Sequence, residues 1–277
     1  MQKYYGIICD VGGKNKGNQD SVFYLQFDVK CAPAYIKDKY FSHQGILALV
    51  CDGVSASHHG DEGSSFVIKH LPMKILNYLF TQNVILSEIQ QIIKRAIQET
   101  NQELIQKYSD EIQKGNIPKT TLVGLLLLGP WVWIFNLGDS RAYLVKDDEI
   151  RQVSLDHVGT GAAHEIVEAI GQDEVQPEIK VFNWAYLPDV QNHYHIFHSK
   201  YYAVLCSDGL TDKVNEQEIN KILQQRTNKE TLQDIVMKLY SLSMDRNIDD
   251  NISIIIIDFK KFFDNLSNIE KIRLEYP

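Results

Sequence analysis

The 277-residue sequence has little of what marks secreted, membrane-spanning or zinc-binding proteins. It has only four cysteines, and no two of them have the C-x-x-C spacing of a zinc or redox site. No stretch approaches the roughly 18 apolar residues of a membrane span, and the N-terminus, Met1-Gln-Lys-Tyr-Tyr-Gly, lacks the apolar region of a signal peptide. We therefore expect a soluble cytoplasmic protein with free thiols in a reducing compartment.

An excess of positive charge is also missing. The chain has 28 lysines and arginines against 36 aspartates and glutamates, for a net charge of −8. This balance argues against non-specific binding to nucleic acid and against docking on an anionic membrane. The hydrophobic fraction of 44% is enough for a substantial core. With no sensor or membrane domain evident, we expect a monomer.

Aspartates beside glycines are what the sequence does contain. Apolar runs lead directly into Asp52, Asp139 and Asp208, and a fourth aspartate, Asp250, comes just before the run that begins at Ile252. Strand ends that bring carboxylates together create repulsion unless a cation lies among them. Oxygen ligands without histidine or cysteine favour Mg²⁺ or Mn²⁺, and two such ions can activate water and bind phosphate oxygens. A single Asp-Gly pair is more often a turn, so the order of the motifs matters more than any one of them.

The pattern of apolar residues predicts an α+β protein. Short runs rich in Val, Ile, Tyr and Phe predict strands near residues 4–9, 21–27, 46–51, 120–128, 131–137, 141–146, 149–153, 202–206 and 252–258. Apolar residues at three- and four-residue steps predict helices over 61–80, with a kink or break near Pro72, and over 85–114, 216–225 and 231–246. Two packed sheets with a layer of helices outside each would satisfy this order.

Two segments are less regular. Residues 157–200 are rich in glycine, proline and histidine, and we expect a mobile segment there with a short helix around 162–170. Residues 28–45 resemble a hairpin extension between early strands, which is either a long loop or a surface for a partner.

Taken in chain order, the motifs resemble those of the metal-dependent (type 2C, or PPM) serine/threonine protein phosphatases, in a bacterial-like single-domain form. The resemblance covers residues 4 to 259. It rests on Asn18-Gln19-Asp20-Ser21, Val50-Cys51-Asp52-Gly53-Val54-Ser55, Gly60-Asp61-Glu62-Gly63-Ser64, Thr120-Thr121, Asn136-Leu137-Gly138-Asp139-Ser140-Arg141-Ala142-Tyr143, Asp156-His157, Cys206-Ser207-Asp208-Gly209-Leu210-Thr211-Asp212 and Asp250-Asn251-Ile252-Ser253.

The resemblance implies a four-layer α-β-β-α sandwich of two mainly antiparallel sheets, with a phosphatase domain over 1–260 and a C-terminal tail over 261–277 that adds a short helix. It implies hydrolysis of phosphoserine and phosphothreonine in proteins by a metal-activated water at a binuclear Mg²⁺ or Mn²⁺ centre, opposing a serine/threonine kinase. The roles implied at matching positions are metal binding by Asp52, the backbone carbonyl of Gly53, Asp208 and Asp250, action through water by Asp20, and binding of a third, weaker ion by Asp139.

Three positions depart from the family pattern. Asn15 stands where members commonly have an arginine that holds the substrate phosphate, so Lys14 or Lys16 is either its substitute or a solvated loop residue. Gln19 replaces a glutamate found in many members. His58 or His59 is either the general acid for the leaving alcohol or a surface histidine. Two alternatives therefore stay open: a pseudophosphatase that serves as a regulatory or binding module, and a hydrolase of small phosphoesters.

Overall fold

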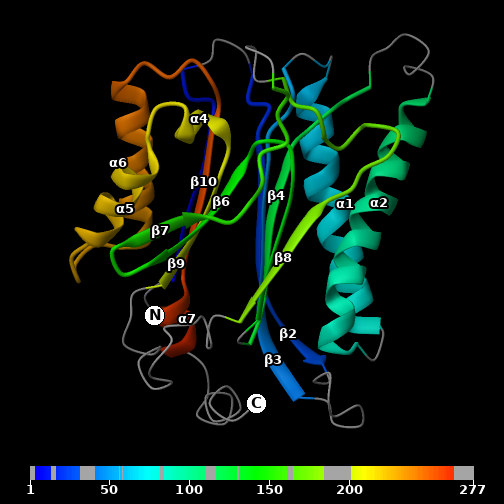
Figure 1. The fold of residues 1–277 in the computed structure, drawn as a ribbon, viewed down its shortest axis with the longest axis horizontal. Coiled ribbons are helices and arrows are strands. Elements are labelled where there is room, and N and C mark those ends of the chain that lie inside the picture. The colour runs from blue at the N-terminus through cyan, green and yellow to red at the C-terminus, as the bar shows by residue number, and fades with distance from the viewer. Residues whose placement is uncertain are drawn as a thin grey trace.

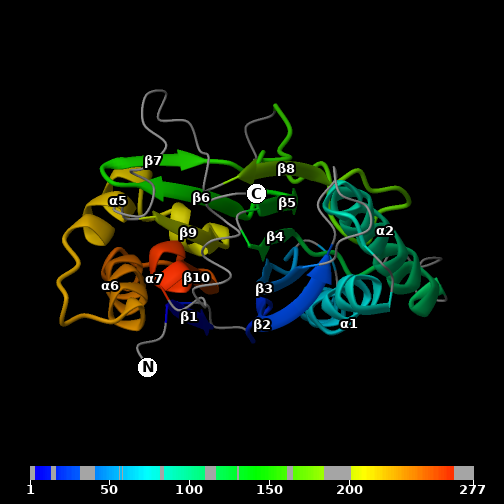
Figure 2. The same ribbon diagram turned by 90° about the horizontal axis from the view of Figure 1, so that it is seen from below.

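The computed structural model is a layered α-β-β-α sandwich (Figure 1). It describes residues 4–13, 17–31, 41–55, 57, 59–81, 84–109, 117–129, 131–160, 165–183 and 201–264. Two five-stranded sheets lie face to face. Helices α1 and α2 cover the outer face of one sheet, and α5 and α6 cover the outer face of the other, as both views show (Figure 2).

Every strand pair in the two sheets is antiparallel. Sheet A has the order β1 (Tyr5–Asp10), β10 (Ile252–Asp258), β9 (Tyr201–Cys206), β6 (Arg141–Lys146) and β7 (Glu149–Gln152). Sheet B has the order β2 (Ser21–Cys31), β3 (Phe41–Cys51), β4 (Leu122–Leu128), β5 (Trp131–Leu137) and β8 (Glu178–Asn183).

The helices fall into two groups. Sheet B carries α1 (Gly60–Thr81) and α2 (Ile89–Lys107), which follows the short 3₁₀ helix η1 (Leu86–Glu88). Sheet A carries α4 (Asp208–Thr211), α5 (Glu216–Gln224) and α6 (Leu232–Asp245), and α7 (Phe259–Asp264) follows its strand β10. Asn215 and Thr231 cap α5 and α6, each accepting a hydrogen bond from the backbone N–H three residues on.

Successive side chains of a strand point to opposite faces of its sheet, and this alternation explains the apolar layers of the fold. In β3, Leu47 and Leu49 pack toward α1 and α2, whereas Ile46, Ala48 and Val50 pack between the two sheets. All seven residues of β4 and of β10 are buried because a helix layer covers one face and the other sheet covers the opposite face. A third apolar cluster joins sheet A to α5 and α6. The core therefore consists of three apolar layers, and a functional site can form at the ends of the strands, outside these layers.

Most of the predicted elements are present, and the fold class is confirmed. Each predicted strand occurs within a few residues of its expected position, and the four long helices occur as well. Helix α1 continues through Pro72 without a break, so the predicted interruption is wrong.

The segment after residue 157 differs most from the prediction. The helix expected over 162–170 is absent from its described part, 165–170, where isolated bridges join Val158 to Ile166 and Thr120 to Ile170. Strand β8 was not predicted, because its sequence, Glu-Ile-Lys-Val-Phe-Asn, has charged and apolar residues typical of an exposed edge.

Residues 32–40 of the expected hairpin extension and 265–277 of the tail lie outside the described residues. Helix α7 runs across the expected boundary between domain and tail. In the part of the chain that the structure describes, no helix is long and apolar enough to cross a membrane.

Candidate metal and phosphate site

Strand pairing brings the predicted aspartates to one end of the sandwich. Ser21, the first residue of β2, pairs with Cys51, the last residue of β3, so Asp20 and Asp52 are neighbours at the same strand end. In sheet A, Ile254 pairs with Cys206, so Asp208, after β9, and Asp250, before β10, share an end as well. The two pairs of acids meet between the sheets, since Asp52 interacts with the charges of Asp20, Asp208 and Asp250, and Ser207 beside Asp208 hydrogen-bonds to Asp20.

The pKa values of the carboxyl groups are shifted by burial and by the charges of the neighbouring acids. Burial raises the pKa of Asp52 well above its usual value, and the charges of Asp20, Asp208 and Asp250 raise it further. Burial also raises the pKa of Asp208 to about 7, with the charges of Asp139 and Asp250 adding to the shift. The pKa of Asp20 is raised, first by burial and then by Asp250, against the opposing effect of its hydrogen bonds. Without a cation, this arrangement is electrostatically unfavourable at neutral pH.

Several carboxylate oxygens have no hydrogen-bond partner. Among the described residues, Asp20 Oδ1, Asp139 Oδ1 and Asp208 Oδ1 are buried and unpaired. A buried carboxylate oxygen left in this state costs free energy unless a proton or a cation satisfies it. The set of donors, all oxygens, suits Mg²⁺ or Mn²⁺. Over the same described residues, however, no three acidic, histidine or cysteine side chains are already arranged as ligands of one ion.

Serine and threonine hydroxyls hold two of the acids in place. Ser207 Oγ donates to Asp20 Oδ2 at 2.8 Å and accepts from the Ser253 backbone N–H at 3.0 Å, which joins Asp20 to sheet A. Thr121 Oγ1 accepts from the Asp52 backbone N–H at 3.0 Å. The same hydroxyl lies 2.7 Å from Ser140 Oγ, so the turn that carries Asp139 is linked to Asp52.

Close backbone approaches surround the acids. A Cβ added to Gly53 would lie 2.4 Å from the carbonyl of Gly60, the first residue of α1. A Cβ added to Gly209 would lie 1.9 Å from the carbonyl oxygen of Asn251. Glycine is therefore required at both positions by contact with neighbouring backbone, and the Asp-Gly pairs are packing features as well as turns.

Asn251 has a role that sequence reasoning missed. Its side chain is buried, its Oδ1 accepts from the Gln19 backbone N–H at 2.9 Å, and its Nδ2 donates to the Val11 carbonyl at 2.9 Å. One side chain next to Asp250 thus joins Val11 to Gln19. The motif Asp250-Asn251 was visible in the sequence, but the sequence does not indicate which backbone groups Asn251 contacts. Lys14, Asn15 and Lys16 lie outside the described residues.

Comparison with known proteins agrees with this geometry. The protein phosphatase 2C family model matches residues 36–242, more than half of the chain. The chain belongs to the protein phosphatase 2C family.

Relatives of the chain include curated phosphatases of bacteria. It is 27% identical to the serine/threonine phosphatase stp of Listeria innocua, with 76% of this chain and 84% of that protein covered. It is 25% identical to the protein phosphatase PhpP of Streptococcus pneumoniae, with coverages of 78% and 82%.

Solved structures share the fold. A bacterial serine phosphatase matches with a TM-score of 0.68 at 23% identity, covering 93% of this chain and 98% of that one. The serine/threonine phosphatase Stp1 from Staphylococcus aureus matches with a TM-score of 0.68 at 22% identity, with coverages of 93% and 95%.

Two other motifs of this phosphatase 2C chain serve the scaffold. Arg141 donates from Nε at 2.9 Å and from Nη2 at 2.7 Å to Asp156 Oδ2, so its guanidinium is engaged in an ion pair. His157 Nδ1 accepts from the Gly138 backbone N–H at 3.2 Å, and the His157 backbone N–H donates to the Gly138 carbonyl at 3.0 Å. The two interactions connect the residues on either side of Asp139 to Asp156 and His157.

The predicted general-acid histidines are only partly described. His59 is exposed, has a positive φ of 71°, and its carbonyl accepts the Glu62 and Gly63 backbone N–H groups at the start of α1. Its Nδ1 lies 3.4 Å from Glu62 Oε1. These contacts begin the helix, and none of them joins His59 to the acids. His58 lies outside the described residues.

Proposed function

We propose that this protein is a metal-dependent phosphatase that removes phosphate from phosphoserine and phosphothreonine in proteins. The observation that carries the proposal is the convergence of Asp20, Asp52, Asp208 and Asp250 at one end of a phosphatase 2C fold, with pKa values of three of them raised. Buried carboxylates that repel one another are expected where a divalent cation binds in the active protein.

Two Mg²⁺ or Mn²⁺ ions are the cofactors that these donors fit, with Asp52, the Gly53 carbonyl, Asp208 and Asp250 as ligands. The unpaired oxygens of Asp20 and Asp208 support this assignment. When bound, the ions would supply Lewis-acid activation of water and stabilisation of charge on the transferring phosphoryl group. Because the carboxylates are not yet arranged as a ligand set, their side chains would reorient when an ion binds.

The remaining roles belong to residues around the acids. Ser207 orients Asp20, which would contact the centre through water, and Asp139, with its buried unpaired Oδ1, would hold a third, weaker ion. Asn251 holds Val11 and Gln19 in place. Lys14 and Lys16, which come between them in the sequence, are the residues we assign to the substrate phosphate. His58 or His59 would protonate the leaving alcohol.

Hydrolysis of a phosphothreonine peptide tests the proposal. We expect turnover with Mn²⁺, none with a chelator, and a loss of at least a hundredfold in kcat in Asp208→Asn. The matched control is Asp249→Asn, which changes an exposed aspartate in the same segment. Turnover that survives the chelator would contradict the metal centre.

The same assay separates the alternatives. No turnover of any phosphoester by the wild type with Mn²⁺ would favour a pseudophosphatase with a binding role. Faster turnover of small phosphoesters than of phosphopeptides would favour a small-molecule hydrolase. In a cell, we expect the substrates to be products of a serine/threonine kinase, and gel filtration tests our expectation of a monomer.

A further inference from the structure

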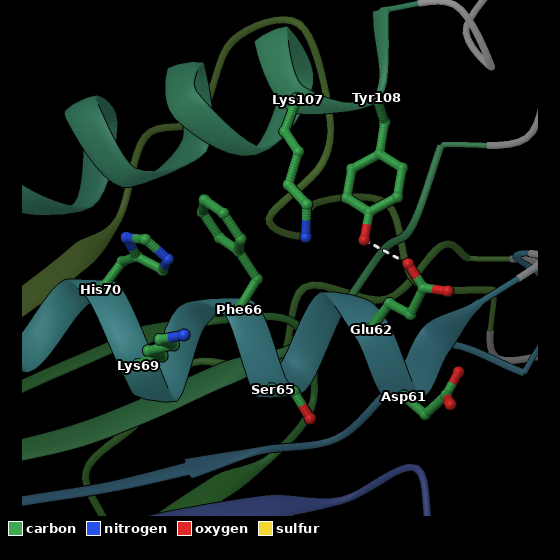
Figure 3. A pocket seen from close by; sticks show the side chains of 8 residues that line it. All are labelled: Asp61, Glu62, Ser65, Phe66, Lys69, His70, Lys107 and Tyr108. Atoms are coloured by element: carbon green, nitrogen blue, oxygen red, sulfur yellow. Dashed lines mark hydrogen bonds between the residues drawn. The ribbon is translucent and has the colours of Figure 1, made fainter.

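A pocket of about 350 Å³ lies between α1 and the end of α2 and contains none of the four acids of the candidate site. Its walls are drawn in Figure 3 and comprise Asp61, Glu62, Ser65, Phe66, Lys69, His70, Lys107 and Tyr108. The phosphatase reaction leaves these residues without a role, and the sequence motifs assigned none to Lys69 or Lys107.

The pocket has one acidic and one basic end. Asp61 and Glu62 lie in the first turn of α1, where Glu62 accepts a hydrogen bond from the Tyr108 hydroxyl. Lys69 lies two turns further along the helix, and Lys107 reaches in from α2, its Nζ 5.3 Å from the centre of the Phe66 ring (Figure 3). Charge therefore changes sign along the pocket.

Lys69 and Lys107 supply the positive charge of this pocket. Neither Lys69 nor Lys107 forms an ion pair with a residue in the described ranges, although Lys107 also lies 4.8 Å from the centre of the Tyr108 ring. Burial lowers the pKa of His70, which stacks on Phe66 at 4.0 Å, so this imidazole adds little charge at neutral pH. The ammonium group of Lys107 lies over two aromatic rings, and with the ammonium group of Lys69 in the same pocket it fits a carboxylate or phosphate group.

The acidic end is continuous with the candidate site. Gly60, the residue before Asp61, packs directly against Gly53, which follows Asp52. From Asp61 to Lys69 the helix rises about 12 Å at ~1.5 Å per residue. An extended peptide covers that distance with about four residues.

We propose that this pocket is a docking subsite for the phosphoprotein substrate, taking an acidic side chain about three to five residues from the phosphorylated one. The proposal rests on the proposed phosphatase function. Lys69 and Lys107 attract the distant acidic residue, while Asp61 and Glu62 repel an acidic residue next to the phosphorylated one and accept a neutral or basic residue there.

A set of phosphothreonine peptides tests this specificity. Each peptide carries a single glutamate, placed in turn at each of the five positions on either side of the phosphothreonine in an otherwise uncharged sequence, with an all-alanine peptide as reference. In the wild type with Mn²⁺, we expect kcat/KM to be highest when glutamate is three to five residues away on one side, by about three- to tenfold over the reference, and lowest when it is adjacent. Raising the salt concentration should reduce the preference.

The double variant Lys69→Gln/Lys107→Gln assigns the preference to the pocket. Its ratio of kcat/KM between the best glutamate peptide and the reference should fall to about one, and the change should lie in KM. Lys229→Gln, at an exposed lysine between α5 and α6, is the matched control and should keep the ratio. A flat profile in an active wild type, or a ratio unchanged in the double variant, would overturn the subsite alone. A wild type inactive on every peptide would instead overturn the phosphatase function.

Discussion

Replacing Asp208 by asparagine should make the metal-free protein more stable while it removes activity. Burial raises the pKa of this carboxyl from 3.8 to about 7. That shift corresponds to about 4 kcal/mol of unfolding free energy lost once the group is ionised. An asparagine removes the charge but keeps a buried polar group, so we expect a net gain of about 2 kcal/mol at pH 8.

The size of this stabilisation depends on pH in a defined way. Because the folded-state pKa of Asp208 lies above the unfolded one, the folded wild type binds more protons between about pH 4 and 7, and its stability falls as pH rises through this window. Below pH 4 the carboxyl is protonated in both states. The advantage of Asp208→Asn should therefore be absent at pH 4 and grow up to pH 8.

Thermal unfolding in a chelator measures this effect. A gain of about 2 kcal/mol corresponds to a rise in Tm of roughly 4 °C for a chain of this size. Asp249→Asn, at an exposed position, should leave Tm unchanged. Added Mn²⁺ should raise the Tm of the wild type more than that of Asp208→Asn. A Tm for Asp208→Asn at or below that of the wild type in the chelator would refute the argument that repulsion and burial destabilise the acids.

Three further substitutions test the scaffold by denaturant unfolding. Gly209→Ala should cost about 3 kcal/mol or more, because its Cβ would lie 1.9 Å from the Asn251 carbonyl oxygen; an unchanged midpoint would contradict that contact. Arg226→Met should cost about 3–5 kcal/mol, because it leaves Asp258 buried without its 3.0 Å partner; adding Asp258→Leu should recover most of the loss. His59→Gly should be about 1 kcal/mol more stable than His59→Ala, since φ is 71° there; the reverse order would contradict the left-handed backbone.

The sequence predicted the layers of this protein because their signals are local. Alternating or continuous apolar runs such as Leu122–Leu128 and Ile252–Asp258 determine strands regardless of their partners, and helical spacing did the same for Ile89–Lys107. Strand β8 and the bridges at residues 158–170 could not be predicted in this way. They form because neighbouring strands and loops offer backbone partners, which the local sequence does not encode.

The sequence by itself also predicted which residues would carry the chemistry, since the aspartates lie in motifs whose order is specific. Only the tertiary structure decided how those aspartates relate to one another. The register of Ser21 with Cys51 and of Ile254 with Cys206 brings four acids to one end of the sandwich, where burial and repulsion raise the pKa of Asp20, Asp52 and Asp208. The supporting contacts of Ser207 and Asn251 and the pocket between α1 and α2 were likewise decided by the structure, because each joins residues far apart in the chain through packing.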